Sequence, residues 1–217
     1  MNSTFVKLAD NHLSVAIAQP KVLHLANRGS KIYNFKRYEY IPLHNDVLWC
    51  IKKGIVRTMT WDEDGNQIVL GLWKEGDIVG SLISTLDPYQ IQCLNDVEVE
   101  VLPLILWEQA STAIINHCQQ TQQLLSIAHC RTIDLRLKKL LSWLSDKFGQ
   151  PCDRGITIGI KLTHQDIADT IGSTRVTMTR SLNQLRLQGL LSWENHYLTL
   201  HQGFPEKIFP SFWESPI

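Results

Sequence analysis

The sequence predicts an α+β protein: an N-terminal antiparallel β-roll, or jelly roll, precedes a long helix and a C-terminal unit of short helices and strands. Three observations support this fold class. Residues 31–104 alternate apolar and polar residues between frequent turns, residues 107–134 contain neither glycine nor proline, and two short amphipathic segments then flank Gly172. Alternation is typical of strands, whereas intervals of three and four residues are typical of helices.

The N-terminal half predicts the roll. The run VLWCIKKGIVRTMTW is separated from QIVLGLW by Asp64-Gly65, which is a strong hairpin signal. The valines at 97, 99 and 101 share one face of a later strand. Strands this short and closely spaced are typical of an antiparallel barrel or jelly roll. We assign residues 1–105 to this domain.

Residues 106–133 predict one long helix. A mostly apolar stripe recurs at intervals near three and four residues and consists of Trp107, Ile114, Cys118, Thr121, Leu125 and Ala128. Such a stripe fits a helix packed on its own roll, and it also fits a dimerisation helix in a short coiled coil. Periodicity alone leaves both interpretations open, and the polar Thr121 weakens the second. Another amphipathic helix follows and is expected to stop at Gly149.

The segment LTHQDIADTIGSTRVTMTRSLNQL carries the strongest functional signal. Thr163 and Asp166 predict a capping box on one helix, Gly172 is placed to end it, and Ser173 or Thr174 caps a second. The inner face of the second helix consists of Met178, Leu182 and Leu185, and its outer face of Arg175, Val176, Thr179, Arg180 and Asn183. With a hairpin around residues 194–196, this predicts a winged helix-turn-helix in residues 134–217.

The outer face of that second helix predicts DNA binding. Arg175 lies in the first turn, where the helix macrodipole disfavours a cation unless an external anion is present. Arginine binds guanine O6 and N7 in a bidentate way, worth roughly 1–3 kcal/mol of discrimination, and apolar groups meet the thymine methyl. The predicted DNA-binding residues are Thr163, His164, Ser173, Thr174, Arg175, Val176, Thr177, Thr179 and Arg180.

Composition excludes several other classes. The 217 residues carry no net charge, but residues 131–217 hold 11 basic and 8 acidic side chains, which permits a nucleic-acid partner. There is no signal-peptide pattern and no apolar run of about 18 residues, so we expect a cytoplasmic protein without a membrane partner. Five scattered cysteines without CxxC predict no metal or cofactor. A cupin-type enzyme is disfavoured because His24, His44 and His117 lie far apart, and we predict no catalytic residues.

The order of roll, long helix and winged helix-turn-helix resembles the CRP/FNR family of bacterial transcription regulators. The run LWCIKKGIVRTMTWDEDGNQIVLGLWKEGDIVGSL is similar to that family's cyclic-nucleotide-binding-like sensory roll. The motif IGSTRVT, followed by TR, resembles the cyanobacterial global nitrogen regulator (NtcA-like) branch, and the resemblance spans about residues 31–201. It implies a homodimer on a pseudo-palindromic operator of double-stranded DNA, with half-sites roughly 34–36 Å apart, and a role in nitrogen control. RNA polymerase is a further candidate partner.

The sensory half departs from the family. Cyclic-nucleotide binders have Gly-Glu-Leu and a later Arg-Ser or Arg-Thr, whereas this chain has Gly80-Ser81-Leu82 and then PYQIQC, so we do not expect a response to cyclic AMP. Nitrogen-branch members bind 2-oxoglutarate through two arginines. Arg131 matches the helix position, but Gln92 stands at the roll position, and one arginine makes a poor dicarboxylate site, so 2-oxoglutarate is only a weak candidate effector. The candidate effector pocket consists of Gly80, Ser81, Leu82, Gln92, Leu124 and Arg131.

Other interpretations stay open at this point. Cys118 and Cys130 could face their copies across a dimer and respond to oxidation, although cytosolic thiols are usually packing residues. The protein could be an effector-independent regulator, or an interaction module on the same fold.

Overall fold

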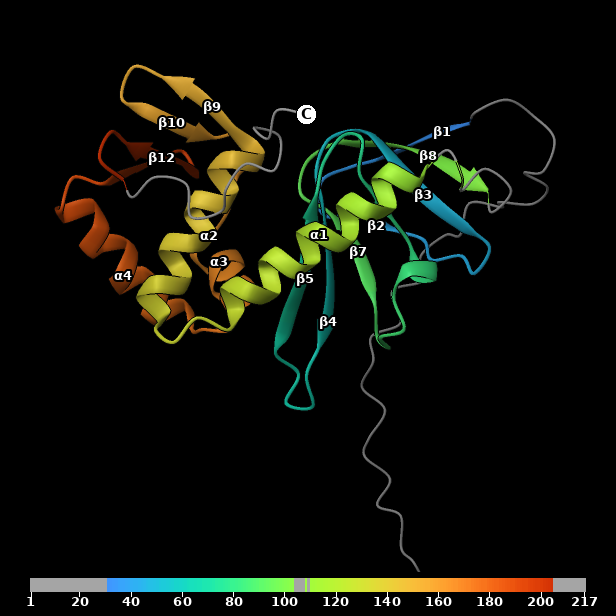
Figure 1. Cartoon of the computed structure of the whole chain (residues 1–217), viewed down its shortest axis with the longest axis horizontal. Helices are drawn as coiled ribbons and strands as arrows, with labels where there is room; N and C mark the ends of the chain where they lie inside the picture. Colours follow the sequence, from blue (N-terminus) through green and yellow to red (C-terminus); the bar gives the residue numbers. More distant parts are fainter. Residues whose placement is uncertain (1–30, 104–107, 109, 205–217) are drawn as a thin grey trace, which may run out of the picture.

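The computed structural model describes residues 31–103, 108 and 110–204. The roll and a C-terminal body of helices and a small sheet lie at opposite ends of the molecule, and a long helix runs across the roll towards that body (Figure 1). The predicted fold class is therefore confirmed.

The roll consists of two four-stranded antiparallel sheets. One has the strand order β1-β8-β3-β6 and the other β2-β7-β4-β5. The elements of the roll are β1 (Ile32–Phe35), β2 (Tyr40–Ile41), β3 (Val47–Lys53), β4 (Val56–Trp61), β5 (Gln67–Trp73), β6 (Ile78–Val79), the 3-10 turn η1 (Ser81–Ile83), β7 (Gln90–Cys93) and β8 (Val97–Pro103). Trp49, Trp73 and Ile91 are fully buried between the sheets, so large side chains fill the interior.

The predicted hairpin joins β4 and β5, with Trp61 opposite Gln67. The carboxylate of Asp62 accepts hydrogen bonds from the backbone N–H groups of Asp64 and Asn66 and fixes the turn. Gly65 has a φ of 79°, a left-handed conformation that glycine adopts without steric cost. The hairpin prediction is confirmed.

Two helices occupy this region, as predicted, but the first ends at Ala128 and not at residue 133. Four residues, 129–132, separate helix α1 (Ser111–Ala128) from α2 (Ile133–Phe148). The hydroxyl of Thr132 accepts a hydrogen bond from the backbone N–H of Leu135 and caps α2. Arg131 consequently lies between the two helices and not on the long one.

The C-terminal body contains α2, α3 (His164–Ile171), α4 (Arg175–Leu187) and a sheet. The strand order of the sheet is β11-β12-β10-β9, where β9 is Gly149–Cys152, β10 Gly155–Ile158, β11 Leu191–Glu194 and β12 Tyr197–His201. The last two strands form the expected wing hairpin, whereas β9 was not predicted. Leucines of α2 pack with the inner faces of α3 and α4 in one core.

This core continues into the roll. Leu72 of β5 and Leu124 and Ile127 of α1 belong to the same buried cluster, and α3 packs against β5. Two ion pairs with mostly buried side chains also join the halves. Arg57 Nη1 lies 2.7 Å from Asp166 Oδ1, and Lys147 Nζ lies 3.0 Å from Asp77 Oδ2. The orientation of the C-terminal body relative to the roll is therefore held by both apolar and ionic contacts.

Lys147 lies at the centre of this junction. Besides Asp77 of the roll, its ammonium group donates hydrogen bonds to the Gln120 side chain of α1 and to the Leu72 carbonyl. It also lies over the Trp73 ring, 4.9 Å from the centroid. Burial lowers the pKa of Lys147 to about 8, while Asp77 opposes that shift. One side chain of α2 thus contacts both the roll and the long helix.

Candidate DNA-binding site

The predicted capping box begins α3. Thr163 Oγ1 accepts a hydrogen bond from the Asp166 N–H at 3.1 Å, and the Asp166 carboxylate accepts one from the Thr163 N–H at 2.7 Å. Gly172 ends the helix in the left-handed conformation, with φ 65° and ψ 56°. These local signals fix the turn from which the next helix starts.

Helix α4 is capped by Thr174, whose hydroxyl accepts a hydrogen bond from the Thr177 N–H at 3.2 Å. Of the two capping candidates, Thr174 is therefore the one used, and the Ser173 hydroxyl is buried without a partner in the described part of the chain. The inner face is buried as expected and consists of Met178, Leu182 and Leu185. Burial of this face fixes which side of α4 points outward.

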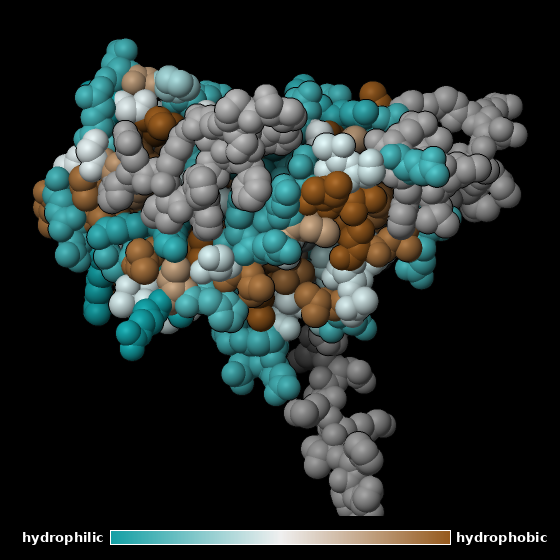
Figure 2. Space-filling view, in the orientation of Figure 1, coloured by the Kyte–Doolittle hydropathy of each residue, from teal (hydrophilic) through white to brown (hydrophobic). Residues whose placement is uncertain are grey.

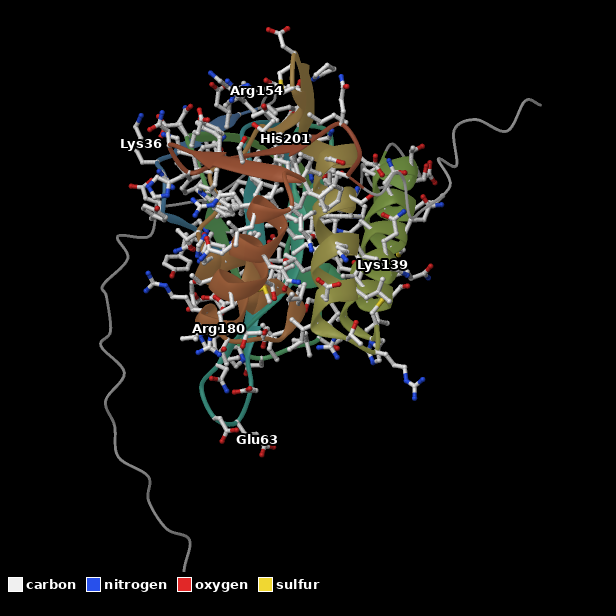
Figure 3. All side chains as sticks on the ribbon, turned by 90° about the vertical axis from the view of Figure 1, so that its left-hand side faces the viewer. Lys36, Glu63, Lys139, Arg154, Arg180 and His201 are labelled. Carbon is white, nitrogen blue, oxygen red and sulfur yellow. The ribbon has the colours of Figure 1, made fainter. Side chains whose placement is uncertain are left out.

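The outward face is basic and exposed. Arg175 and Arg180 are exposed, and Figure 3 labels Arg180 on the surface of this end of the molecule. Neither arginine has a salt bridge to a carboxylate within the described residues. Val176, which follows Arg175, is 60% exposed, so its methyl groups face outward beside the arginine. Two uncompensated cations and an exposed methyl-bearing side chain suit base edges in a major groove.

Thr179 is oriented by its neighbours. Its hydroxyl donates to the Arg175 carbonyl at 2.9 Å and lies 2.8 Å from His164 Nδ1. The His164 ring packs edge-on against Trp193 of the wing, with centroids 4.8 Å apart. Burial lowers the pKa of His164, and Arg175 lowers it further. His164 therefore links the start of α3, the wing and α4. The sequence did not predict the contact between Trp193 and His164, because nothing near Trp193 in the sequence indicates which residue its ring meets.

The candidate effector residues have different surroundings in the structure. Gln92 is buried and accepts a hydrogen bond from Arg57 Nε at 3.0 Å. Ser81 donates to the His44 carbonyl, beside Gly80 and the partly exposed Leu82. Leu124 packs in the core shared with the C-terminal body, and Arg131 is exposed beyond the end of α1. The roll cation bonded to Gln92 is thus Arg57, which is already paired with Asp166.

Helix α1 has two different faces. Leu124 and Ile127 are buried against the body of the protein, whereas Ile115 and Leu125 are 56% and 57% exposed. The predicted stripe is divided between these faces: Cys118, Thr121 and Leu125 are exposed, Ile114 and Ala128 are half-buried, and Trp107 lies outside the described residues. Ile115 was missed because it adjoins Ile114, and sequence periodicity did not separate the two. Figure 2 shows apolar residues gathered along the side of the molecule on which α1 runs.

The remaining candidate sites are the cysteines of the α1 region and any cluster of metal-ligating side chains. Cys118 is exposed, and Cys130 Sγ donates to the Ser126 carbonyl at 3.4 Å. Within the described ranges, no three His, Cys, Asp or Glu side chains are grouped as they would be around a metal ion. None of the helices described here is both long and apolar enough to cross a membrane.

Comparison with known proteins agrees with this geometry. Residues 135–202 match the Crp-like helix-turn-helix domain. Regulatory protein CysR of Synechococcus elongatus is 38% identical over 78% of this chain and 82% of its own length. The global nitrogen regulator of Nostoc sp. is 31% identical over 71% of this chain and 77% of its own. A CRP-family transcriptional regulator of Thermus thermophilus shares the fold, with a TM-score of 0.68 at 21% identity over 78% of this chain and 92% of that one.

Proposed function

Because the chain belongs to the CRP/FNR family of DNA-binding transcription regulators, we propose that it acts as a homodimer on a pseudo-palindromic operator without responding to cyclic AMP. In this proposal residues 1–105 form the sensory domain, residues 106–133 the dimerisation segment and residues 134–217 the DNA-binding domain. We assign it no catalytic activity, and we place its action in the cytoplasm, where chromosomal DNA is found.

The observation that carries the proposal is the outward face of α4. Arg175 and Arg180 are exposed, lack a carboxylate partner in the described residues, and project from a helix held by its buried face. A recognition helix enters the major groove with its N-terminal residues towards the bases. We assign guanine contacts to the two arginines and thymine-methyl contacts to Val176 and the Thr179 methyl group.

The other predicted residues are assigned to the phosphate backbone. Thr163 and His164 lie at the N-terminus of α3, and Ser173, Thr174 and Thr177 lie at that of α4. Helix N-termini attract phosphate through their free N–H groups and the macrodipole. Such contacts would position the protein on the duplex, whereas the outward face of α4 would select the sequence.

The exposed stripe on α1 supports the homodimer. Ile115, Cys118, Gln122 and Leu125 follow one another at intervals of three, four and three residues on the exposed face. These intervals match the a and d positions of a heptad repeat. In a parallel pair of such helices, each residue meets its own copy across the two-fold axis. Oxidation with diamide should therefore link two Cys118 thiols into a covalent dimer, and Cys118→Ser should abolish that product.

The branch of the family to which the relatives belong indicates which target genes to expect. The curated relatives include global nitrogen regulators, at 30% and 31% identity, as well as CysR at 38%. We propose nitrogen-responsive promoters as targets and RNA polymerase as a further partner. Genomic occupancy of the full-length protein, mapped with and without nitrogen starvation, tests this. Occupancy of a shared palindromic motif supports the proposed function, and scattered occupancy without a motif contradicts it.

A further inference from the structure

A cleft of about 280 Å³ lies between the roll and the C-terminal body, on the side of the wing. The roll contributes turn residues to it, among them Arg37, Ile55 and Leu94, and the other half contributes Ile160, Lys161 and Tyr197. Figure 3 shows Lys36, next to Arg37, on the same side of the molecule as the wing strand β12. This cleft is separate from the outward face of α4 and from the α1 stripe.

The charges in the cleft are unbalanced. Within the described residues, neither Arg37 nor Lys161 has a carboxylate within salt-bridge distance. Each cation lies over a tyrosine ring instead, Arg37 over Tyr38 at 4.6 Å and Lys161 over Tyr197 at 5.4 Å. These contacts orient the cations without neutralising them.

One lining residue is acidic, but its charge is already compensated. Asp96 forms a salt bridge with Lys36 at 2.8 Å and also accepts a weaker hydrogen bond from the Arg37 N–H at 3.4 Å. The hydrogen bond from Lys36 lowers the pKa of Asp96. The two unpaired cations therefore leave the cleft with a net positive charge.

The base of the cleft is apolar. Leu94 and Ile160 are 7% and 4% exposed, and Ile55 is half-buried. A ligand pocket commonly combines apolar walls with a few polar groups that orient the ligand, and its volume is usually several hundred Å³. The volume here restricts the ligand to a small molecule.

From these features we propose that the cleft binds a small organic anion, whose carboxylate or phosphate group lies between Arg37 and Lys161 and whose apolar part contacts Leu94 and Ile160. Since one cation comes from each half of the protein, the bound anion would stabilise the orientation of the C-terminal body seen here relative to other orientations. It would therefore change DNA affinity, and typical couplings between two sites are about 5- to 150-fold. Binding of an anion in this cleft is a property separate from the proposed function, because it does not require DNA.

The test uses the full-length protein and three probes, benzoate, phenyl phosphate and inorganic phosphate, in isothermal titration calorimetry at low salt. We expect saturable binding of at least one aromatic anion, at least tenfold tighter than that of inorganic phosphate. Arg37→Gln and Lys161→Gln should each weaken it at least fivefold. Arg186→Gln removes one exposed positive charge from α4 and serves as the control that leaves binding unchanged.

DNA affinity is then measured for the wild type and for Lys161→Gln, each with and without the aromatic anion. A change of threefold or more in the wild type, absent from the variant, supports the proposal. No binding of either aromatic anion, equal binding of inorganic phosphate, binding that survives both substitutions, or unchanged wild-type DNA affinity at saturation overturns it. DNA binding without any anion is recorded in the same experiment, so failure of this site is distinguished from failure of the proposed function.

Discussion

Arg57 of the roll and Asp166 of the helix-turn-helix form an ion pair of 2.7 Å, although 109 residues separate them in the sequence. Their side chains are only 12% and 20% exposed. Within the roll, Arg57 also donates a hydrogen bond to the Gln92 side chain. The Asp166 carboxylate in turn accepts the Thr163 N–H and completes the capping box of α3. The same carboxylate therefore stabilises the start of α3 and attaches α3 to the roll.

This pair should contribute measurably to stability. We expect a coupling of about 1–3 kcal/mol in the free energy of unfolding from a double-mutant cycle of Arg57→Met and Asp166→Asn, measured by urea denaturation. The exposed pair Lys36–Asp96, with side chains 76% and 66% exposed, is the matched control and should give a clearly smaller coupling, because water screens it. A coupling no larger than that of the control would show that the pair does not hold the two halves together.

His164 should make stability depend on pH. Burial and Arg175 lower its pKa in the folded protein below the unfolded value of 6.5. Between these two pKa values the unfolded chain binds more protons, so the folded protein loses stability as the pH falls below about 6.5. His164→Gln should lose less stability than the wild type between pH 7 and 5 in urea denaturation. The control is His196→Gln in the exposed wing, which should lose as much stability between pH 7 and 5 as the wild type does. Parallel curves for wild type and His164→Gln would refute this assignment.

The exposed face of α1 should control the oligomeric state. Leu125→Glu places a charge in the middle of the proposed dimer contact and should convert dimers to monomers in sedimentation equilibrium. Leu187→Glu is the control, because Leu187 is 85% exposed on α4, away from this contact. If Leu125→Glu remains dimeric, the interface lies elsewhere.

Cyclic AMP should leave DNA affinity unchanged. Ser81 stands where the nucleotide-binding motif has glutamate, and the buried Gln92 is bonded to an arginine that is itself paired with Asp166. A nucleotide phosphate would therefore have to compete with this pair for its cation. Fluorescence anisotropy of a labelled operator, with and without cyclic AMP, should give equal dissociation constants. A tighter complex in its presence would contradict this account of the roll.

The features predicted best were those that depend on residues close together in the sequence. Thr163, Asp166 and Gly172 fix the ends of α3 through contacts within a few positions, so the helix-turn-helix could be located from the sequence. The start of α2 near Ile133 was predicted, but the end of α1 at Ala128 was placed too late, at residue 133, because this segment contains no glycine or proline to mark it. Strand β9 was missed because it contains Pro151, which disfavours strands.

Contacts between distant segments could not be predicted from the sequence. The partner of Arg57 lies on another domain, and no periodicity relates their positions. The exposed face of α1 was ambiguous for a different reason. Apolar residues occur on both sides of this helix, so the choice between Ile114 and Ile115 depends on where the roll packs.

The central claim is that α4 recognises bases through Arg175 and Arg180, and selection of duplexes from a random library tests it most directly. The full-length wild type should enrich a pseudo-palindrome with half-sites about 10–10.5 base pairs apart, centre to centre. Arg180→Ala should lose about 5- to 150-fold in its preference for that site over random duplex, as expected from removal of roughly 1–3 kcal/mol of base discrimination. The control Arg186→Ala should keep the preference. An unchanged preference in Arg180→Ala, or no enriched motif in the wild type, would contradict the claim.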